Sequence, residues 1–436
     1  MRVRRHRRLV LALTLLVLTA VLGPIAGSAG AEASHGHAAM APQVRGDIRI
    51  ESDAQFDRAH GVRSGRGTAR SPYLISGWDV RRIWISNTGA HLLIRDNMID
   101  VLILDWNGPH VHVHGNRVGD LAVNRNVERT GSATRGTIAH NTVRLLSQLR
   151  HYDGVFEHNT VGNPAGAGGS GRFTDQVALV AGFNGTRFRY NTIYGYVEAR
   201  LHGHHHGSGF GKPSHAHSSH GAPADHSRRY HELWIHGNTI RSDHAWALRY
   251  FDTGHAGNDG TNNSETNRAL NRPHIHFTRV HLTGNRLVGS GIRADVFNPA
   301  DRKHTGTSRG LLEVSGNTIR LRDPQLDPSA SRDGIGLLNL HDVNVRLVRN
   351  VIEGPSKAPA EPLGVLTGLQ QAAGIRVEGV QEGRVWIIDN RVSHRRFGVF
   401  ALRFDEQVHW VVRRLVTEAV QEPVHYDDSV KNAPTA

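Results

Sequence analysis

The densest group of side chains that could do chemistry lies in LHGHHHGSGFGKPSHAHSSHGAPADHSRRYH, residues 201–231, which contains nine histidines. Neutral imidazole is a good ligand for Zn, Cu and Ni, so this stretch is a candidate metal-binding segment. Its Gly, Ser and Pro residues indicate a flexible loop, whereas catalytic metal sites use few ligands on rigid elements. We therefore expect either a solvated linker or a loop of modest metal affinity. The candidate ligands are His202, His204, His205, His206, His215, His217 and His220.

A second group of histidines alternates with valines in HVHVHGN, residues 110–116. Because successive side chains of a strand point to opposite faces, His110, His112 and His114 share one face. Val113 holds a position that is apolar in every repeat of the chain, so the histidines are expected to face outward. The simplest interpretation is the solvent-exposed side of a strand.

Charged side chains recur in four short segments, VEARL, WALRY, GIRADV and GIRVEG, which align on their apolar positions. The alignment leaves Glu198, Arg200, Arg249, Arg293, Asp295, Arg376 and Glu378 facing outward, and Asp252 and Asp405 end neighbouring segments. Carboxylates can act as general acids or bases or hold a cation such as Ca, and arginines bind the carboxylates of uronic acids. We assign Asp295, Glu198, Arg293 and Arg249 as candidate catalytic residues, and Arg200, Arg376, Glu378 and Asp252 as candidate substrate-binding residues. The alternative is that such rows only keep the face of a sheet soluble.

A repeated phrase indicates which elements position these side chains. Ten asparagines, called anchors below, each have one apolar residue two positions later and another three positions earlier. The anchors are Asn97, Asn116, Asn141, Asn159, Asn191, Asn238, Asn285, Asn317, Asn350 and Asn390. Positions five residues apart point to opposite faces of a straight strand, so the chain must turn a corner at each anchor for both to enter one core. Asn tolerates the left-handed conformation expected at this corner, and stacked Asn side chains can hydrogen-bond from coil to coil.

The spacing between anchors varies from 18 to 47 residues, as expected for coils of a β-solenoid with insertions of different length. A second strand signal follows each anchor. The pattern predicts an all-β fold, a single right-handed parallel β-helix of about ten or more coils. Aligning WIIDNRV with WVVRRLV places Arg414 where a further anchor would stand, which is typical of a terminal capping repeat. A short helix is expected at residues 53–60.

The lead-in at residues 48–80 has an acidic-aromatic start at Asp53 and Phe56, followed by GV-x-x-G-x-GT and PYLISGW. The coil NT-x-A-x-x-x-IR-x-N comes next, at residues 87–97. In these motifs the chain resembles the NosD-type, pectate-lyase-like right-handed β-helix proteins built from PbH1 repeats. The resemblance implies that the lead-in caps the N-terminal end of the solenoid. It carries no catalytic residue over, because this superfamily includes lyases, hydrolases, epimerases, accessory proteins and surface proteins.

The N-terminus reads as a signal peptide, with MRVRRHRR followed by the apolar run LVLALTLLVLTAVLGPIA. We divide the chain into a signal peptide (1–31), a disordered linker (32–46), a cap (47–80), the β-helix with its His-rich loop (81–427) and a disordered tail (428–436). Removing the five arginines of the signal lowers the formal net charge from +13 to +8. With no cysteine, the chain has no disulfides and no lipoprotein anchor. We expect a secreted or cell-envelope protein, with an uncleaved membrane anchor as the alternative.

Three functions remain open from the sequence. A basic exported chain favours acidic partners, so the first is binding of an acidic polysaccharide or cell-envelope polymer in an Arg/Asp/Glu-lined groove. Cleavage by a lyase or glycoside hydrolase mechanism would be an addition to this binding. Insertions after Asn159, Asn191, Asn238 and Asn285 are expected to wall the groove. The second is a NosD-like metal-handling accessory role for the His-rich loop, and the third is a non-catalytic surface protein. We expect a monomer that binds no nucleic acid and has no membrane span after signal cleavage.

Overall fold

The structure is a computed structural model of the 436-residue chain. It describes residues 42–105, 107, 110–123, 134–150, 152–166, 173, 175–181, 185–201, 230–252, 277–296, 310–322, 333–355, 373–404 and 408–426. These residues belong to one compact unit, Pro42–Ala436. The expected signal peptide, most of the expected linker and the expected tail lie outside the described residues.

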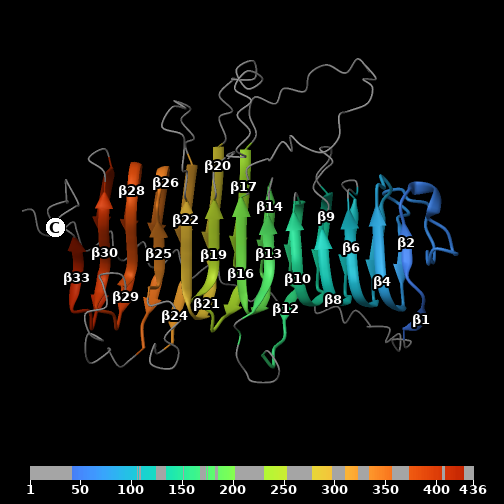
Figure 1. The fold of residues 1–436 in the computed structure, drawn as a ribbon, viewed down its shortest axis with the longest axis horizontal. Coiled ribbons are helices and arrows are strands. Elements are labelled where there is room, and N and C mark those ends of the chain that lie inside the picture. Colours follow the sequence, from blue (N-terminus) through green and yellow to red (C-terminus); the bar gives the residue numbers. More distant parts are fainter. Residues whose placement is uncertain are drawn as a thin grey trace, which may run out of the picture. The chain divides into compact units, whose positions relative to one another are not determined.

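The described part is a parallel β-helix, with strands stacked side by side from coil to coil (Figure 1). We group its strands into three rows, called the first, second and third sheets, in the order in which each coil visits them. The first sheet precedes the anchors and contains β3 (Tyr73–Ser76), β5 (Leu92–Arg95), β7 (Val111–His114), β9 (Thr134–Ala139), β11 (Tyr152–Glu157), β14 (Thr186–Arg189), β17 (Tyr230–His236), β20 (Phe277–Thr283), β23 (Gly310–Ser315), β26 (His341–Val348), the second half of β28 (Ala373–Ile388) and β31 (His409–Arg413). Its twelve strands exceed the lower bound of ten coils expected from the anchors.

The second and third sheets follow each anchor. The second contains β12 (Thr160–Gly162), β15 (Thr192–Tyr194), β18 (Thr239–Arg241), β21 (Arg286–Gly289), β24 (Thr318–Leu321), β27 (Val351–Glu353), β29 (Arg391–Ser393) and β32 (Val416–Glu418). The third contains β13 (Gln176–Ala181), β16 (Tyr196–Leu201), β19 (Trp246–Asp252), β22 (Gly291–Val296), β25 (Ile335–Leu338), the first half of β28, β30 (Phe397–Phe404) and β33 (Glu422–Tyr426). Four strands, β4 (Trp78–Ser86), β6 (Met98–Asp105), β8 (Arg117–Val123) and β10 (Thr142–Arg150), run through both.

All pairings between named strands are parallel, and each strand pairs with its counterpart in the next coil. For example, Ile193 on β15 pairs with Ile240 on β18, which pairs with Leu287 on β21. Like residues therefore stack in rows along the helix. The apolar residues two after and three before every anchor are at most 3% exposed, so both predicted apolar positions enter one core. The prediction of a parallel β-helix is confirmed.

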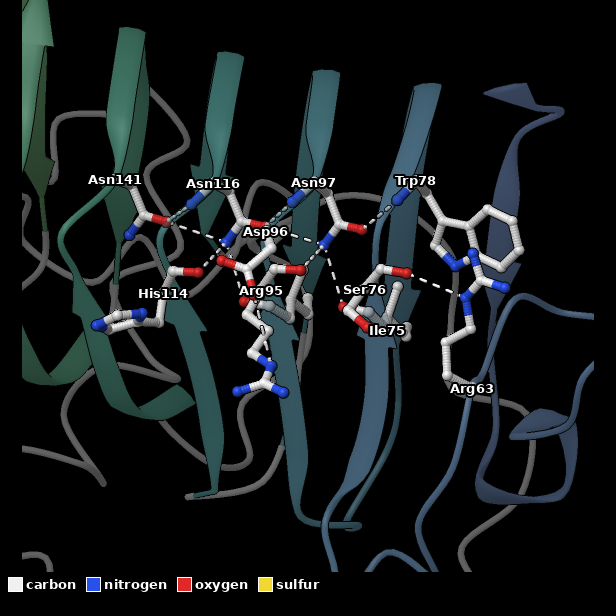
Figure 2. A network of polar contacts seen from close by, with 11 residues as sticks. Arg63, Ile75, Ser76, Trp78, Arg95, Asp96, Asn97, His114, Asn116 and Asn141 are labelled. Atoms are coloured by element: carbon white, nitrogen blue, oxygen red, sulfur yellow. Dashed lines mark hydrogen bonds and ion pairs between the residues drawn. The ribbon is translucent and has the colours of Figure 1, made fainter. Parts of the chain in front are cut away.

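The anchors form one continuous ladder inside the corner between the first and second sheets. Each anchor donates from Nδ2 to the Oδ1 of the next anchor at 2.9–3.2 Å, from Asn97 through to Asn390. Its backbone N–H donates to the same oxygen at 2.9–3.1 Å. At the start of the ladder the Trp78 N–H donates to Asn97 Oδ1 at 3.0 Å (Figure 2). The ladder thus satisfies buried polar groups in every coil, as the repeat predicted.

The prediction that the anchor itself adopts the left-handed conformation is wrong. The residue before each anchor does so, with φ between 53° and 65°, and no anchor has a positive φ. The residues are Asp96, Gly115, His140, His158, Tyr190, Gly237, Gly284, Gly316, Arg349 and Asp389. The physical reason is that the anchor side chain must point inward along the ladder, so the preceding residue makes the turn. This explains why Gly so often precedes the anchor.

The predicted position of the degenerate anchor is wrong by one residue. Arg391 on β29 pairs with Val416 on β32, so Leu415 stands where the next anchor would lie. Arg414 instead has the left-handed φ of 52° and forms an ion pair with Asp389 at 2.6 Å. The ladder still ends at Asn390, because Leu415 has no side-chain amide to continue it.

Two boundaries at the N-terminal end also differ from the expectation. β1 (Gln43–Arg45) lies in the expected linker and pairs with the start of β4, so the ordered part begins before residue 46. β4 crosses the expected cap boundary at residue 80 and already belongs to the solenoid. β2 (Ile48–Ile50) pairs with the same strand, and the expected helix at residues 53–60 is only a 3-10 turn, Asp53–Gln55.

Candidate functional site

The seven charged residues predicted to face outward lie in two rows on the outward side of the third sheet. Glu198 on β16, Arg249 on β19 and Arg293 on β22 pair side by side in one row. In the second row Arg200 pairs with Phe251, which pairs with Asp295. Neighbouring residues of a row lie about 4.8 Å apart, so their side chains can interact. We call the outward side of β16, β19 and β22 the arginine face.

Buried carboxylates hold the arginines of this face. Asp295 is 5% exposed and accepts hydrogen bonds from Arg293 Nε at 2.7 Å and from Nη2 at 3.1 Å. Arg249 Nη2 lies 3.7 Å from the same carboxylate, and Arg200 Nε contacts Glu198, which is 4% exposed. The arginine side chains keep 31% to 39% of their surface exposed. The guanidinium groups therefore form the accessible layer, and the carboxylates lie beneath them.

This layering bears on the roles predicted for Asp295 and Glu198. A general acid or base must reach the proton that it transfers, at hydrogen-bond distance from the substrate. Both carboxylates are buried and already engaged by arginines. The geometry suits carboxylates that orient arginines better than carboxylates that exchange protons with a ligand.

Arg376 and Glu378, predicted to bind substrate, form a separate buried ion pair on β28. Arg376 donates to Glu378 Oε2 from Nε at 3.1 Å and from Nη2 at 2.6 Å. Arg376 is 6% exposed and Glu378 is 9% exposed. Gly336 on β25 separates Arg376 from Arg293 in the row. The structure therefore places this pair in the same row as the arginine face, but not at its accessible surface.

Asp333 lies beside this pair, with Oδ2 at 3.9 Å from Arg376 Nη1. Burial raises the pKa of Asp333, while a hydrogen bond from the Ala373 N–H and the charges of Arg376 and Arg395 act in the opposite direction. The folded state therefore binds more protons than the unfolded state. Stability is lost as the pH rises from the unfolded pKa towards the folded pKa.

The replacement Asp333→Asn should remove this loss. Asparagine keeps the oxygen that accepts from the Ala373 N–H at 3.0 Å, but it cannot ionise. We expect the thermal midpoints of the variant and the wild type to converge near about pH 4, and the variant to be the more stable at about pH 7. Thermal unfolding across this pH range measures the difference. A gap that does not change with pH would contradict the assignment.

Aromatic side chains surround the arginines, a feature that the sequence analysis missed. The Tyr196 and His244 rings stack with centroids 4.2 Å apart. The Arg249 guanidinium lies 5.0 Å from the centroid of Phe251, and that of Arg293 lies 5.3 Å from the centroid of Trp246. Burial, followed by the charge of Glu198, raises the pKa of Tyr196. The signal was present in the strand segments YVEARL and WALRYF, where aromatics alternate with the charged positions.

The remaining candidates of this region lie outside what the structure describes. Residues 202–229, which include all seven predicted metal ligands, and Asp405 are not described. Asp252 is placed only by its backbone, which pairs with Leu201 and Val296. The chain leaves β16, β19 and β22 into residues 202–229, 253–276 and 297–309, so the walls predicted for a groove remain a prediction.

His114, at the end of β7, belongs to a row of rings on the outside of the anchor corner. His114, His140, His158, Tyr190 and His236 follow one another with centroids 5.0–5.4 Å apart. His112 is exposed, as predicted, and His110 stacks on His91 at 3.7 Å. Partial desolvation of the His112 imidazole, followed by the charges of His110 and His91, lowers the pKa of His112. Within the described ranges, no three His, Asp or Glu side chains are grouped so that they could hold a metal ion.

A further cluster on the first sheet was also missed. The Trp234 and His281 rings stack with centroids 3.8 Å apart. His281 Nδ1 lies 2.8 Å from Glu313, and Nε2 lies 3.7 Å from Glu232. His281 is 7% exposed and its Nε2 is buried, so the cluster joins three coils rather than offering an accessible base. Insertions separate these residues by 32 and 47 positions, which hides the register from the sequence.

No protein-family model, curated protein or solved structure matches this chain. Among the described residues, no helix has the length and apolar character needed to span a bilayer. Function must therefore be argued from the arginine face itself.

Proposed function

We propose that this chain is an exported β-helix protein that binds an acidic polysaccharide, or a related acidic polymer of the cell envelope, along the arginine face. The observation that carries the proposal is a set of partly exposed guanidinium groups on three consecutive coils, of which Arg200 and Arg293 are each bonded to a buried carboxylate. The N-terminal signal-like segment and the resemblance to NosD-type, pectate-lyase-like proteins support the exported, solenoid-based part of the proposal.

Arginines that are already oriented suit this role because their side chains lose little conformational entropy when the ligand binds. Asp295 engages Nε and Nη2 of Arg293, so the plane of the guanidinium group is set while Nη1 keeps its donors. Arg249 lies too far from Asp295 for a hydrogen bond, at 3.7 Å, and no described residue accepts from its Nε. Planar, pre-oriented guanidinium groups recognise carboxylates by paired hydrogen bonds. Arg200 on β16 is likewise held by Glu198, so oriented groups stand two coils apart with Arg249 between them, which fits an extended anionic chain.

Binding is the part of the function that the geometry supports best. Cleavage of the polymer by a lyase or hydrolase mechanism would need an accessible acid or base, and Asp295 and Glu198 are buried under their arginines. We therefore assign these two carboxylates the role of positioning residues. Arg200, Arg249 and Arg293 are the residues that we propose to touch the polymer.

The double variant Arg249→Ala with Arg293→Ala tests the proposal. Each partly exposed ion pair with the polymer contributes up to about 1 kcal/mol, so loss of both should weaken polyuronate binding about tenfold at low salt. The salt dependence of binding should also become shallower, because fewer charges are screened. Titration calorimetry at several salt concentrations, with a neutral glucan as the reference polymer, measures both effects.

The matched control is Arg117→Ala with Arg286→Ala. These arginines are exposed and follow anchors at the start of β8 and β21, so the control removes the same charge away from the arginine face. Binding should stay close to that of the wild type. If the two double variants lose the same affinity for polyuronate, net charge alone explains the effect and the proposal is overturned. Equal binding of polyuronate and neutral glucan by the wild type would also overturn it.

A further inference from the structure

The hydrophobic core of the β-helix is covered at its N-terminal end. The inward residues of β2, Ile48 and Ile50, are fully buried. Phe56 and Val62, which follow β2 in the lead-in, are buried in the same core. The Phe56 ring also stacks on Tyr73 of β3, with centroids 4.4 Å apart. The described part of the first coil therefore presents a closed core.

The C-terminal end of the same core is open. Val412 on β31 pairs with the fully buried Ile387, and Val424 on β33 pairs with the fully buried Val399. Both valines of the last coil nevertheless remain partly exposed, as does Leu415 at the corner between β31 and β32. All three pack against the core and keep an accessible side. The last coil thus ends the hydrophobic core without covering it.

The last coil also has three free strand edges. β31, β32 and β33 pair with β28, β29 and β30 of the previous coil, and no described strand pairs with their other edge. Free edges of this kind pair readily with further strands. Here they surround the apolar residues of the open end, so a partner that pairs with the edges also buries those residues. Such a partner needs strand edges around an apolar centre, in a cross-section that matches this solenoid.

We infer that the partner is a second copy of this chain, joined C-terminal end to C-terminal end, in place of the monomer expected from the sequence. A second copy offers the same three edges around the same apolar centre. The N-terminal end offers no such centre, because the lead-in covers the core there, so the arrangement is two-fold rather than head to tail. In this dimer β31 pairs antiparallel with the partner's β31, and the two hydrophobic cores become continuous.

Charges at the rim of the open end fit this arrangement. Arg413 and Arg414 are exposed where β31 ends. Antiparallel pairing brings them towards the start of the partner's β31, which lies beside the end of β33, because the Trp410 and Tyr426 rings are 5.0 Å apart. Two aspartates follow Tyr426 directly in the sequence. The two-fold arrangement therefore directs a basic corner of each copy towards an acidic stretch of the other.

The variant Val412→Glu tests the inference, because it places a carboxylate at the centre of the open end. Sedimentation velocity should show a dimer for the wild type. The two-fold axis places the substitution in the interface twice, so we expect the dissociation constant of the dimer to rise about a hundredfold. Val416→Glu lies at the rim and should raise it about tenfold. Val416 is 55% exposed, so this second variant leaves the core of the monomer intact.

Val351→Glu is the matched control. Val351 is exposed in the same row as Val416, two coils earlier, and the substitution adds the same charge away from the open end. It should leave the dimer unchanged. Circular dichroism and the thermal midpoint verify that each variant keeps the fold.

Three outcomes would overturn the inference. A wild type that stays monomeric at about 100 µM would show that the open end does not pair with a second copy. A dimer that survives both Val412→Glu and Val416→Glu would have its interface elsewhere. Assemblies that grow beyond two copies with concentration would contradict the closed two-fold arrangement. Polymer binding by the arginine face is independent of all three.

Discussion

Replacing Asn238 by Leu should destabilise the β-helix by about 1–3 kcal/mol, although leucine has a similar volume and suits a buried site. Asn238 is fully buried, and its Oδ1 accepts from the backbone N–H and the Nδ2 of Asn191, both at 2.9 Å. Its Nδ2 donates to Asn285 Oδ1 and to the Phe188 carbonyl oxygen, both at 3.0 Å. Leucine leaves the Asn191 N–H and the Phe188 carbonyl without these partners in a site that water cannot reach.

Asn344→Leu is the matched control, because it makes the same chemical change on the outward side of β26, away from the ladder. Its effect should stay below about 0.5 kcal/mol. Urea denaturation measures both variants, and hydrogen exchange at the Asn191 amide reports the local loss directly. A repeat protein can open in parts, so the two measurements should agree only if the coils unfold together. If both substitutions lower the free energy of unfolding equally, the ladder makes no particular contribution to stability.

The sequence predicted the architecture because the constraint is geometric. Two apolar positions five residues apart can share a core only around a corner, and the ten anchors repeat that arrangement. The inward direction of Val113, and hence the outward direction of His112, followed from the same argument and is confirmed. The ladder was also predicted, since asparagines stacked in register in a buried row can hydrogen-bond to one another.

The local conformation at the corner did not follow from residue preferences. Asn has the stronger preference for the left-handed region, yet His140, His158 and Tyr190 adopt it beside their anchors. Hydrogen bonds across coils fix the anchor side chain, and that long-range demand outweighs the local preference. The predicted position of the degenerate anchor in the terminal repeat was wrong for a related reason. Trp386 is partly exposed and Trp410 is buried, so aligning one tryptophan on the other shifted the register by one residue.

The arginine face could be predicted in outline, but its pairing could not. Strand periodicity predicts that Glu198, Arg249 and Arg293 lie in one row, and the structure pairs them in this way. Residue types and spacing do not predict that the carboxylates are buried beneath the arginines, because burial depends on the packing of whole side chains. The i, i+2 contacts were the available signal: Arg293 with Asp295, and Arg376 with Glu378, stand two apart on one face of a strand. Trp246 and Gly336 lie 90 residues apart and meet only because the coils stack in register.

Asp295→Asn should weaken polyuronate binding even though it makes the protein more positive. Asp295 fixes Arg293 with hydrogen bonds of 2.7 and 3.1 Å and attracts Arg249 at 3.7 Å. Asparagine keeps the shape but loses the charge and one acceptor, so both guanidinium groups gain freedom that binding must remove again. We expect affinity for polygalacturonate to fall about three- to tenfold, with a loss of about 1 kcal/mol in folding stability because the arginines are partly solvated.

Asp100→Asn provides the control for this prediction, since Asp100 is exposed on β6 and the substitution changes the net charge equally. Calorimetric titration of both variants at one salt concentration separates three roles of Asp295. A positioning role lowers the affinity in Asp295→Asn and leaves it unchanged in Asp100→Asn. A role in bulk electrostatics raises the affinity in both. A role as acid or base leaves binding at the wild-type level and removes only turnover of the polymer, and that result would refute the positioning role argued here from the burial of the carboxylate.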